Sequence, residues 1–239
     1  MKLYDDLAWV WSVITPVDAY QEEAENLWEI LCSALGREPM SILEFGCGGG
    51  YLLHQMPKEM SACLVDISEQ MLAESKRLNP QKKHLLGDML TIDCQEHFDC
   101  ILIHDAVMYL QSEEQALLLL ENCKRHLREG GRIILIPDAI KETFYERHFI
   151  AGAEGVHQGK DVSLRLVEWH WDPKSDDDIV QVEFSLLIRQ DGAVRSVHES
   201  HEMMVLSLGQ WMNIFSKAQL KQEFPNPPWF GGGEFFLLS

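Results

Sequence analysis

The segment Ser41-Ile42-Leu43-Glu44-Phe45-Gly46-Cys47-Gly48-Gly49-Gly50 places a short apolar run directly before a cluster of glycines. Glycines let the backbone turn sharply and let a ligand approach it without a Cβ in the way. Helical spacing of Leu52, Leu53 and Met56 follows, so free N–H groups at a helix start would point at a polar ligand. The segment therefore predicts a strand–turn–helix unit that binds a ligand.

Strands and helices continue to alternate on the C-terminal side of this unit. The apolar runs predict strands at 62–66, 84–86, 98–104 and 132–137, and the helical spacing predicts helices at 69–78 and 113–127. Strands that alternate with helices form βαβ units, whose parallel sheet is covered on both faces. The sequence thus predicts an α/β fold over about residues 36–138.

The rest of the chain follows different patterns. Residues 1–35 have helical spacing interrupted at Pro16, which predicts a helical cap. Alternating apolar and polar residues predict three antiparallel strands, at 163–171, 179–189 and 194–206. We therefore divide the chain into four parts. Residues 1–35 form a helical cap and 36–150 the ligand-binding core. Residues 151–206 form a β-rich insertion, and 207–239 form a final helix with strands that complete the core.

Charge and composition exclude several classes of partner. The 239 residues include 20 Lys and Arg against 38 Asp and Glu, a formal net charge of −18. Such an excess disfavours binding to nucleic acid or to an anionic membrane. The six cysteines form no C-x-x-C pair, and Asp5 and Asp6 lie where a secretion signal would be apolar. We expect reduced cysteines and a cytoplasmic protein, and we leave a homodimer open.

A dinucleotide site is the first alternative for the glycine cluster. Its G-x-G-x-x-G fingerprint would require glycine where Tyr51 stands. Asp66, about twenty residues further on, would suit the ribose of either kind of cofactor. A nicotinamide-dependent oxidoreductase is therefore the less favoured interpretation.

Five segments, in order along the chain, resemble the class I S-adenosylmethionine-dependent methyltransferases, in particular those that methylate small molecules on nitrogen. The glycine cluster matches the family's E/D-x-G-x-G-x-G motif, and the other four segments follow it at 65–68, 87–89, 98–107 and 127–135. The resemblance implies a Rossmann-like, doubly wound sheet of seven mostly parallel strands. It also implies that the β-rich insertion after the fifth strand is a lid over the acceptor pocket.

The resemblance further implies the cofactor, S-adenosylmethionine, and its product, S-adenosylhomocysteine. Asp66 would accept both ribose hydroxyls, Asp88 the adenine amine, and Glu44 would approach the methionine portion. Tyr4, in an opening similar to the family's Y-D-x-L-A, would pack against the sulfonium. The implied cofactor-binding set is Tyr4, Glu44, Gly46, Cys47, Gly48, Gly50, Asp66, Ile67, Asp88, Met89, His104, Asp105 and Ala106.

An amine acceptor must lose a proton before it attacks the methyl group in line, so a nearby base assists. We expect His104 as that base or as an acceptor-orienting group, with His170 and His201 from the lid. Each of these two lid histidines shares a strand face with a carboxylate two residues earlier. His198 and His201 point to opposite faces, so we expect no metal site.

The predicted function is methyl transfer from S-adenosylmethionine to a small-molecule acceptor, most simply an amine nitrogen. The alternative from another class is a non-catalytic protein of the same fold that binds the cofactor as a sensor or as a partner subunit. Intact glycines and acids favour an occupied cofactor site, but they do not separate these two functions.

Overall fold

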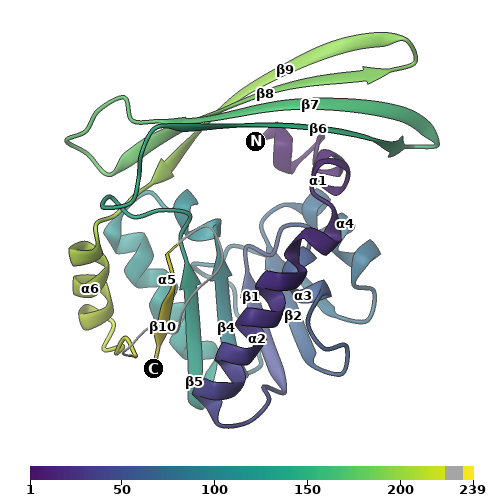
Figure 1. The fold of residues 1–239 in the computed structure, drawn as a ribbon. Coiled ribbons are helices and arrows are strands. Elements are labelled where there is room, and N and C mark those ends of the chain that lie inside the picture. Colours follow the sequence, from purple (N-terminus) through teal and green to yellow (C-terminus); the bar gives the residue numbers. More distant parts are fainter. Residues whose placement is uncertain (224–233) are drawn as a thin grey trace.

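The computed structural model describes residues 1–223 and 234–239, which form a mixed sheet with a second sheet across one of its ends (Figure 1). The order of the first sheet is β10-β5-β4-β1-β2-β3. Its strands are β1 (Ser41–Phe45), β2 (Ser61–Asp66), β3 (Lys83–Leu86), β4 (Phe98–His104), β5 (Leu127–Ile136) and β10 (Phe236–Leu238). All pairs are parallel except β10 with β5. The predicted Rossmann-like α/β sheet is confirmed.

The seventh strand expected from the resemblance is reduced to a short pairing. Within residues 1–223 and 234–239, this sheet has six strands, and Gln222 forms an antiparallel bridge to Leu238 beyond β10. Lys221 and Ser239 exchange two backbone hydrogen bonds of 2.9 Å beside this bridge. Among the described residues, this edge position therefore holds a short pairing and no seventh strand.

Helices cover both faces of this sheet (Figure 1). The helices are α1 (Trp9–Ile14), α2 (Gln21–Leu35), α3 (Tyr51–His54), α4 (Glu69–Leu78), α5 (Glu113–His126) and α6 (Leu208–Lys217), with the 3-10 turns η1 (Lys2–Tyr4), η2 (Val17–Tyr20) and η3 (Ala106–Tyr109). Ser68, Ser112 and Ser207 cap α4, α5 and α6 by accepting a backbone N–H with the side chain. Local sequence therefore sets where these three helices begin.

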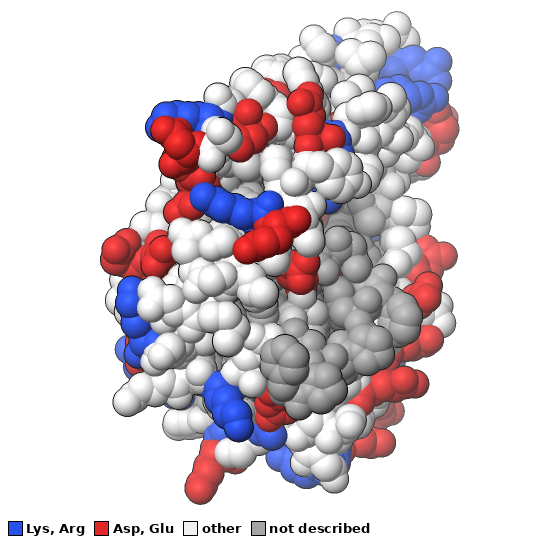
Figure 2. All heavy atoms as spheres, turned by 60° about the vertical axis from the view of Figure 1, so that its left-hand side comes forward, with Lys and Arg blue, Asp and Glu red and all other residues white. Residues whose placement is uncertain are grey.

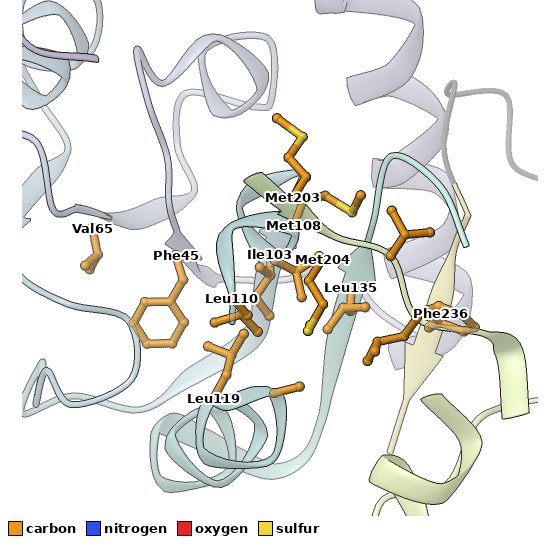
Figure 3. Close-up of a cluster of buried hydrophobic side chains, with 14 of the residues drawn as sticks. Phe45, Val65, Ile103, Met108, Leu110, Leu119, Leu135, Met203, Met204 and Phe236 are labelled. Atoms are coloured by element: carbon orange, nitrogen blue, oxygen red, sulfur yellow. The ribbon is translucent and has the colours of Figure 1, made fainter. Parts of the chain in front are cut away.

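The side chains of β1 alternate between two hydrophobic cores. Ile42 packs with α2 and α3, whereas Leu43 and Phe45 pack with α5 and α6. Both faces of the strand are buried, which explains its continuous apolar run. Figure 3 shows Met203 and Met204 reaching into the second core beside Leu135.

The lid is an antiparallel sheet of four strands rather than the expected three. They are β6 (Arg147–His157), β7 (Lys160–Trp171), β8 (Ile179–Gln190) and β9 (Ala193–Met204), paired in that order. Strand β6 is an edge strand whose side chains are mostly exposed and which contains Gly152 and Gly155. Without a buried face it shows no clear alternation, so the sequence pattern did not reveal it.

The inner face of the lid belongs to the same hydrophobic core as α5. The buried side chains of Leu164, Val182, Leu186 and Ile188 alternate along β7 and β8 with exposed residues, and all four are part of that core. The lid is therefore fixed to the first sheet by packing, with α1 beneath β6 (Figure 1).

The surface carries the negative excess of the composition. On the face in Figure 2, many Lys and Arg side chains stand beside Asp and Glu, while several acidic side chains along one side stand alone in view. Among the described residues, no helix is long and apolar enough to cross a membrane.

Candidate active site

A cavity of about 1250 Å³ lies between the carboxyl ends of the parallel strands and the inner face of the lid. The turns after β1, β2, β3 and β4 form one side, and residues of β7, β8 and β9 form the other. Open α/β sheets bind ligands at the carboxyl ends of their strands. The cavity therefore lies where the fold predicts a ligand.

The glycine turn after β1 forms the floor of this cavity. Gly46, Gly48 and Gly50 have φ values of +69°, +51° and +69°, which side-chain-bearing residues rarely adopt. A Cβ on Gly46 would overlap the Cβ of Ala106, so the β1 and β4 turns touch there. Cys47 donates its backbone N–H to Val65 O at 3.0 Å, which fixes the turn against β2.

Asp66 lies at the end of β2 and already holds two backbone amides. Its Oδ2 accepts from Gly48 N and its Oδ1 from Ser68 N, both at 2.8 Å. Burial raises the pKa of this carboxyl, and these backbone bonds oppose the rise. Each carboxylate oxygen has a second lone pair, so both oxygens can still accept a ribose hydroxyl. Asp66 thus ties the glycine turn to the β2 turn and offers a bidentate acceptor.

The residues expected to contact the adenine lie in the turns after β2 and β3 and line the cavity. Asp88 accepts the backbone N–H of Leu90 with Oδ1 at 2.8 Å and lines the cavity. Ile67 also lines it with 71% of its surface exposed, an apolar side chain that lacks a protein partner of matching size. Met89 is half-buried, packs on the core and also lines the cavity. Both apolar side chains suit contact with a flat ring.

Glu44 provides a direct test of the fit to S-adenosylmethionine. Its side chain is 3% exposed, and its Oε2 has no hydrogen-bond partner among the described residues. Burial raises its pKa to about 8, and the nearby His104 imidazole opposes that rise. A buried carboxylate oxygen without a partner is costly, and the ammonium of a methionine moiety would satisfy it. The donors and acceptors present therefore fit this cofactor.

Tyr4 connects the cofactor side of the cavity to the lid. Its hydroxyl lies 2.8 Å from that of Tyr109, which lies 3.0 Å from His201 Nδ1. His201 Nε2 lies 3.1 Å from Glu199 Oε1, and Glu199 accepts the backbone N–H groups of Lys2 and Leu3. Burial lowers the pKa of His201, against the raising effect of Glu199. Tyr4 and His201, both expected at the site, are thus brought together.

His104 lies at the end of β4 between two carboxylates. Its Nε2 is 2.8 Å from Glu23 Oε1, and its Nδ1 is 3.4 Å from Asp105 Oδ2. Burial alone would lower its pKa, but Asp105 and Glu23 outweigh burial and raise it to about 10. His104 therefore holds both ring protons at neutral pH, which suits a fixed cation better than the base expected from the sequence.

The lid brings a carboxylate rather than an imidazole from β7 to the cavity. Glu168 lines the cavity, whereas His170 is 5% exposed behind it, with Nε2 2.5 Å from Glu168 Oε1. The shared-face placement expected for this pair is correct, but His170 orients Glu168 instead of facing the cavity. His201 does face it.

Two residues of the site were not identified from the sequence. Asp138 lines the cavity two residues after the end of β5, and the strand-end rule that selected Asp66 could have selected it too. Glu23 comes from the helical cap, on α2, and no motif marks it. Long-range contacts of this kind depend on how the cap packs, which no local pattern records.

The comparisons with known proteins agree with this geometry. Residues 42–131 match the family model described as a methyltransferase domain. No curated protein matches the chain. Several solved structures share its fold over nearly its whole length.

Three of these solved structures illustrate the shared fold. DesVI from Streptomyces venezuelae is 22% identical, with a TM-score of 0.78 over 98% of this chain and 95% of its own. The sugar N-methyltransferase KedS8 from Streptoalloteichus sp. is 19% identical, with a TM-score of 0.80 over 98% and 91%. CalS10 from Micromonospora echinaspora, an amino pentose methyltransferase with S-adenosylmethionine bound, is 20% identical, with a TM-score of 0.72 over 92% and 90%.

The motif series, the cofactor-shaped set of donors and acceptors, the family match and the shared fold all point the same way. Residues 42–131 match the model of a methyltransferase domain, and the chain shares its fold over nearly its whole length with solved S-adenosylmethionine-dependent methyltransferases.

Proposed function

We propose that this enzyme methylates the nitrogen of a small cationic amine that carries no phosphate group near that nitrogen. One observation carries the proposal: Asp105, Asp138 and Glu168 line the acceptor side of the cavity, and no Lys or Arg of residues 1–223 and 234–239 lines it. The ten residues between these ranges contain neither residue type. Carboxylates that line a cavity attract an ammonium and repel a phosphate or carboxylate.

The descriptions of the compared structures support an amine acceptor. KedS8 is a sugar N-methyltransferase and CalS10 an amino pentose methyltransferase. The lid of this chain covers the cavity with the inner faces of β7, β8 and β9. A covered site of this kind aligns two reactants and excludes water, which is the main requirement for a methyl transfer in line.

The cofactor supplies an activated methyl group on a sulfonium, and the protein supplies binding and orientation. Asp66, Asp88 and Glu44 hold the nucleoside and the amino-acid portion, and the glycine turn lets the backbone come close. Tyr4 and Tyr109 close the cavity towards the N-terminal segment. Asp138 and Glu168 orient the acceptor's nitrogen.

A screen with methyl-labelled S-adenosylmethionine tests this proposal. The panel contains methyl glycosides of amino hexoses and linear diamines, each beside a phosphorylated counterpart and a counterpart with hydroxyl in place of the amine. We expect transfer to unphosphorylated amines at least ten times faster than to either counterpart. Faster methylation of the phosphorylated or hydroxyl compounds would rule out the cationic amine.

The Glu168→Gln variant should raise the KM for the accepted amine about ten-fold or more while the affinity for S-adenosylhomocysteine stays within two-fold. The carboxylate lines the acceptor side, and a charge-assisted hydrogen bond to an ammonium contributes roughly 1.5–3 kcal/mol. Glu154→Gln is the matched control, because Glu154 lies on the same lid with 60% of its side chain exposed. Equal KM values for wild type and Glu168→Gln would remove this residue from the acceptor site.

We also propose a cytoplasmic location. The support is that all six cysteines are free thiols, five of them buried, as in a protein of a reducing compartment.

The expected homodimer is tested by light scattering of the purified chain at several concentrations.

A further inference from the structure

We propose that Asp138 takes the proton that the acceptor's ammonium must lose, and that Asp105, His104 and Glu23 position it. This inference rests on the proposed amine acceptor. It assigns the base to a carboxyl pair at the ends of β4 and β5 and gives His104 a supporting role.

Strand pairing brings the two carboxyls together. Parallel strands β4 and β5 pair His104 with Ile136, so the residues that follow both strands meet at the same edge. Asp105 N donates to Ile136 O at 2.9 Å. The carboxyl groups of Asp105 and Asp138 lie close enough for each to shift the pKa of the other, and both line the cavity. Two carboxyls this close cannot both ionise easily, so the pair holds a proton readily.

The backbone of Asp105 is held in an unusual conformation. Its φ of 57° and ψ of −36° lie in a region that non-glycine residues rarely occupy. Strain of this kind is concentrated at functional sites. Here it turns the carboxyl of Asp105 towards both His104 and Asp138.

A fixed cation stands behind the pair. His104 lies between Glu23 and Asp105 and keeps its second proton at neutral pH. A cation at this position stabilises the ionised pair before proton transfer. Four ionisable side chains therefore follow one another from the helical cap to the cavity, in the order Glu23, His104, Asp105 and Asp138.

The pKa of Asp138 suits the task at neutral pH. Burial and the neighbouring Asp105 raise it to about 7, while His104 and Arg147 oppose the rise. The charged and titratable groups around Asp138 and its partners come from η1, α2, β1, the β4 turn, η3 and the lid: Tyr4, Glu23, Glu44, His104, Asp105, Tyr109, Arg147 and Glu168. A general base works best when its pKa lies near the working pH.

Asp138, ionised, accepts H⁺ from R–NH₃⁺ and becomes the neutral acid, leaving R–NH₂. The nitrogen lone pair forms the new N–CH₃ bond as the C–S bond of the sulfonium breaks, and that electron pair stays on sulfur as a neutral thioether. The product leaves as R–NH₂⁺–CH₃, and Asp138 releases its proton to solvent before the next turnover.

A direct titration tests the base without any acceptor. Carboxyl carbons of ¹³C-labelled aspartate are followed by NMR in the enzyme saturated with S-adenosylhomocysteine. We expect one aspartate to titrate between about pH 6 and 8, and its signal to be absent in Asp138→Asn. If the signal that is lost in Asp138→Asn titrates below pH 5 in the wild-type enzyme, the inference is overturned, whatever the acceptor is.

Kinetics with the amino hexose glycoside of the screen separates a base from a binding group. Wild-type kcat should rise with pH through about 7, because only ionised Asp138 accepts a proton. In Asp138→Asn, kcat should fall about 10²-fold or more and lose this inflection. If Asp138 only bound the ammonium, KM would rise and kcat would hold, which would overturn the inference.

Two further measurements exclude a merely structural role. A glycoside fluorinated beside the amine has a less basic nitrogen and therefore needs the base less. The fall in its methylation rate on going from wild type to Asp138→Asn should be at least ten-fold smaller than the fall for the parent compound. Asp138→Asn should bind S-adenosylhomocysteine as wild type does, and Asp161→Asn, an exposed acid of the lid, should leave kcat unchanged. If no amine in the screen were methylated, the proposed function would be contradicted instead. The NMR titration would still test whether Asp138 has the pKa of a base.

Discussion

Asp66→Ala is expected to weaken the binding of S-adenosylhomocysteine by about 2–4 kcal/mol, or roughly 30- to 1,000-fold in Kd. The carboxylate can accept two ribose hydroxyls with the lone pairs that Gly48 N and Ser68 N leave free. Each charge-assisted bond contributes roughly 1–2 kcal/mol, and both are lost together. Isothermal titration calorimetry measures the change directly.

The same substitution also frees the glycine turn from the β2 turn, so the two effects must be separated. Asp66→Asn keeps one acceptor oxygen and nearly the same shape, and we expect it to lose affinity less than Asp66→Ala does. Thermal unfolding without ligand reports how much of the loss is structural. Wild-type affinity in both variants would show that the ribose lies elsewhere.

The cofactor side of the site could be predicted from the sequence because its residues follow strands directly. Asp66 ends β2, His104 ends β4, and the glycine cluster follows β1, so local patterns place all three at one edge of the sheet. In a parallel sheet the carboxyl ends meet there by topology alone. The order of the five motifs along the chain then indicates which ligand binds at this edge.

The acceptor side could not be predicted in the same way. The roles of Glu23, His104 and Asp138 depend on distances between α2, β4 and β5 that no local pattern carries. His104 illustrates this: its position was predicted, but its charge state follows from Glu23, a residue 81 positions earlier in the chain. Protonation depends on neighbours in space, so the sequence does not decide whether His104 acts as a base or as an acceptor-orienting group.

Edges of sheets were the other source of error. Strand β6 lies at an edge, where one side has no neighbour and the side chains are less buried. Hydrophobic alternation records burial, so strands with little burial leave little pattern. The central strands, buried on both faces, were all found.

Gly46→Ala is expected to destabilise the fold by about 2–5 kcal/mol and to abolish measurable cofactor binding. A side-chain-bearing residue at φ +69° costs roughly 1–2 kcal/mol, and overpacking against Ala106 adds roughly 1–3 kcal/mol. The added methyl group must push the β1 turn away from the β4 turn, and both turns line the cavity. Urea denaturation gives the free energy of unfolding, and calorimetry with S-adenosylhomocysteine gives the binding.

Two matched variants divide this cost between backbone strain and collision. Gly130 has a φ of +75° with no atom within 4 Å of an added Cβ, so Gly130→Ala carries the strain alone, about 1–2 kcal/mol, and should bind cofactor normally. The double variant Gly46→Ala/Ala106→Gly removes the collision and should recover stability and binding in part. If Gly46→Ala costs no more than Gly130→Ala, or if the Ala106→Gly change restores nothing, then contact between the two turns does not shape the cofactor site.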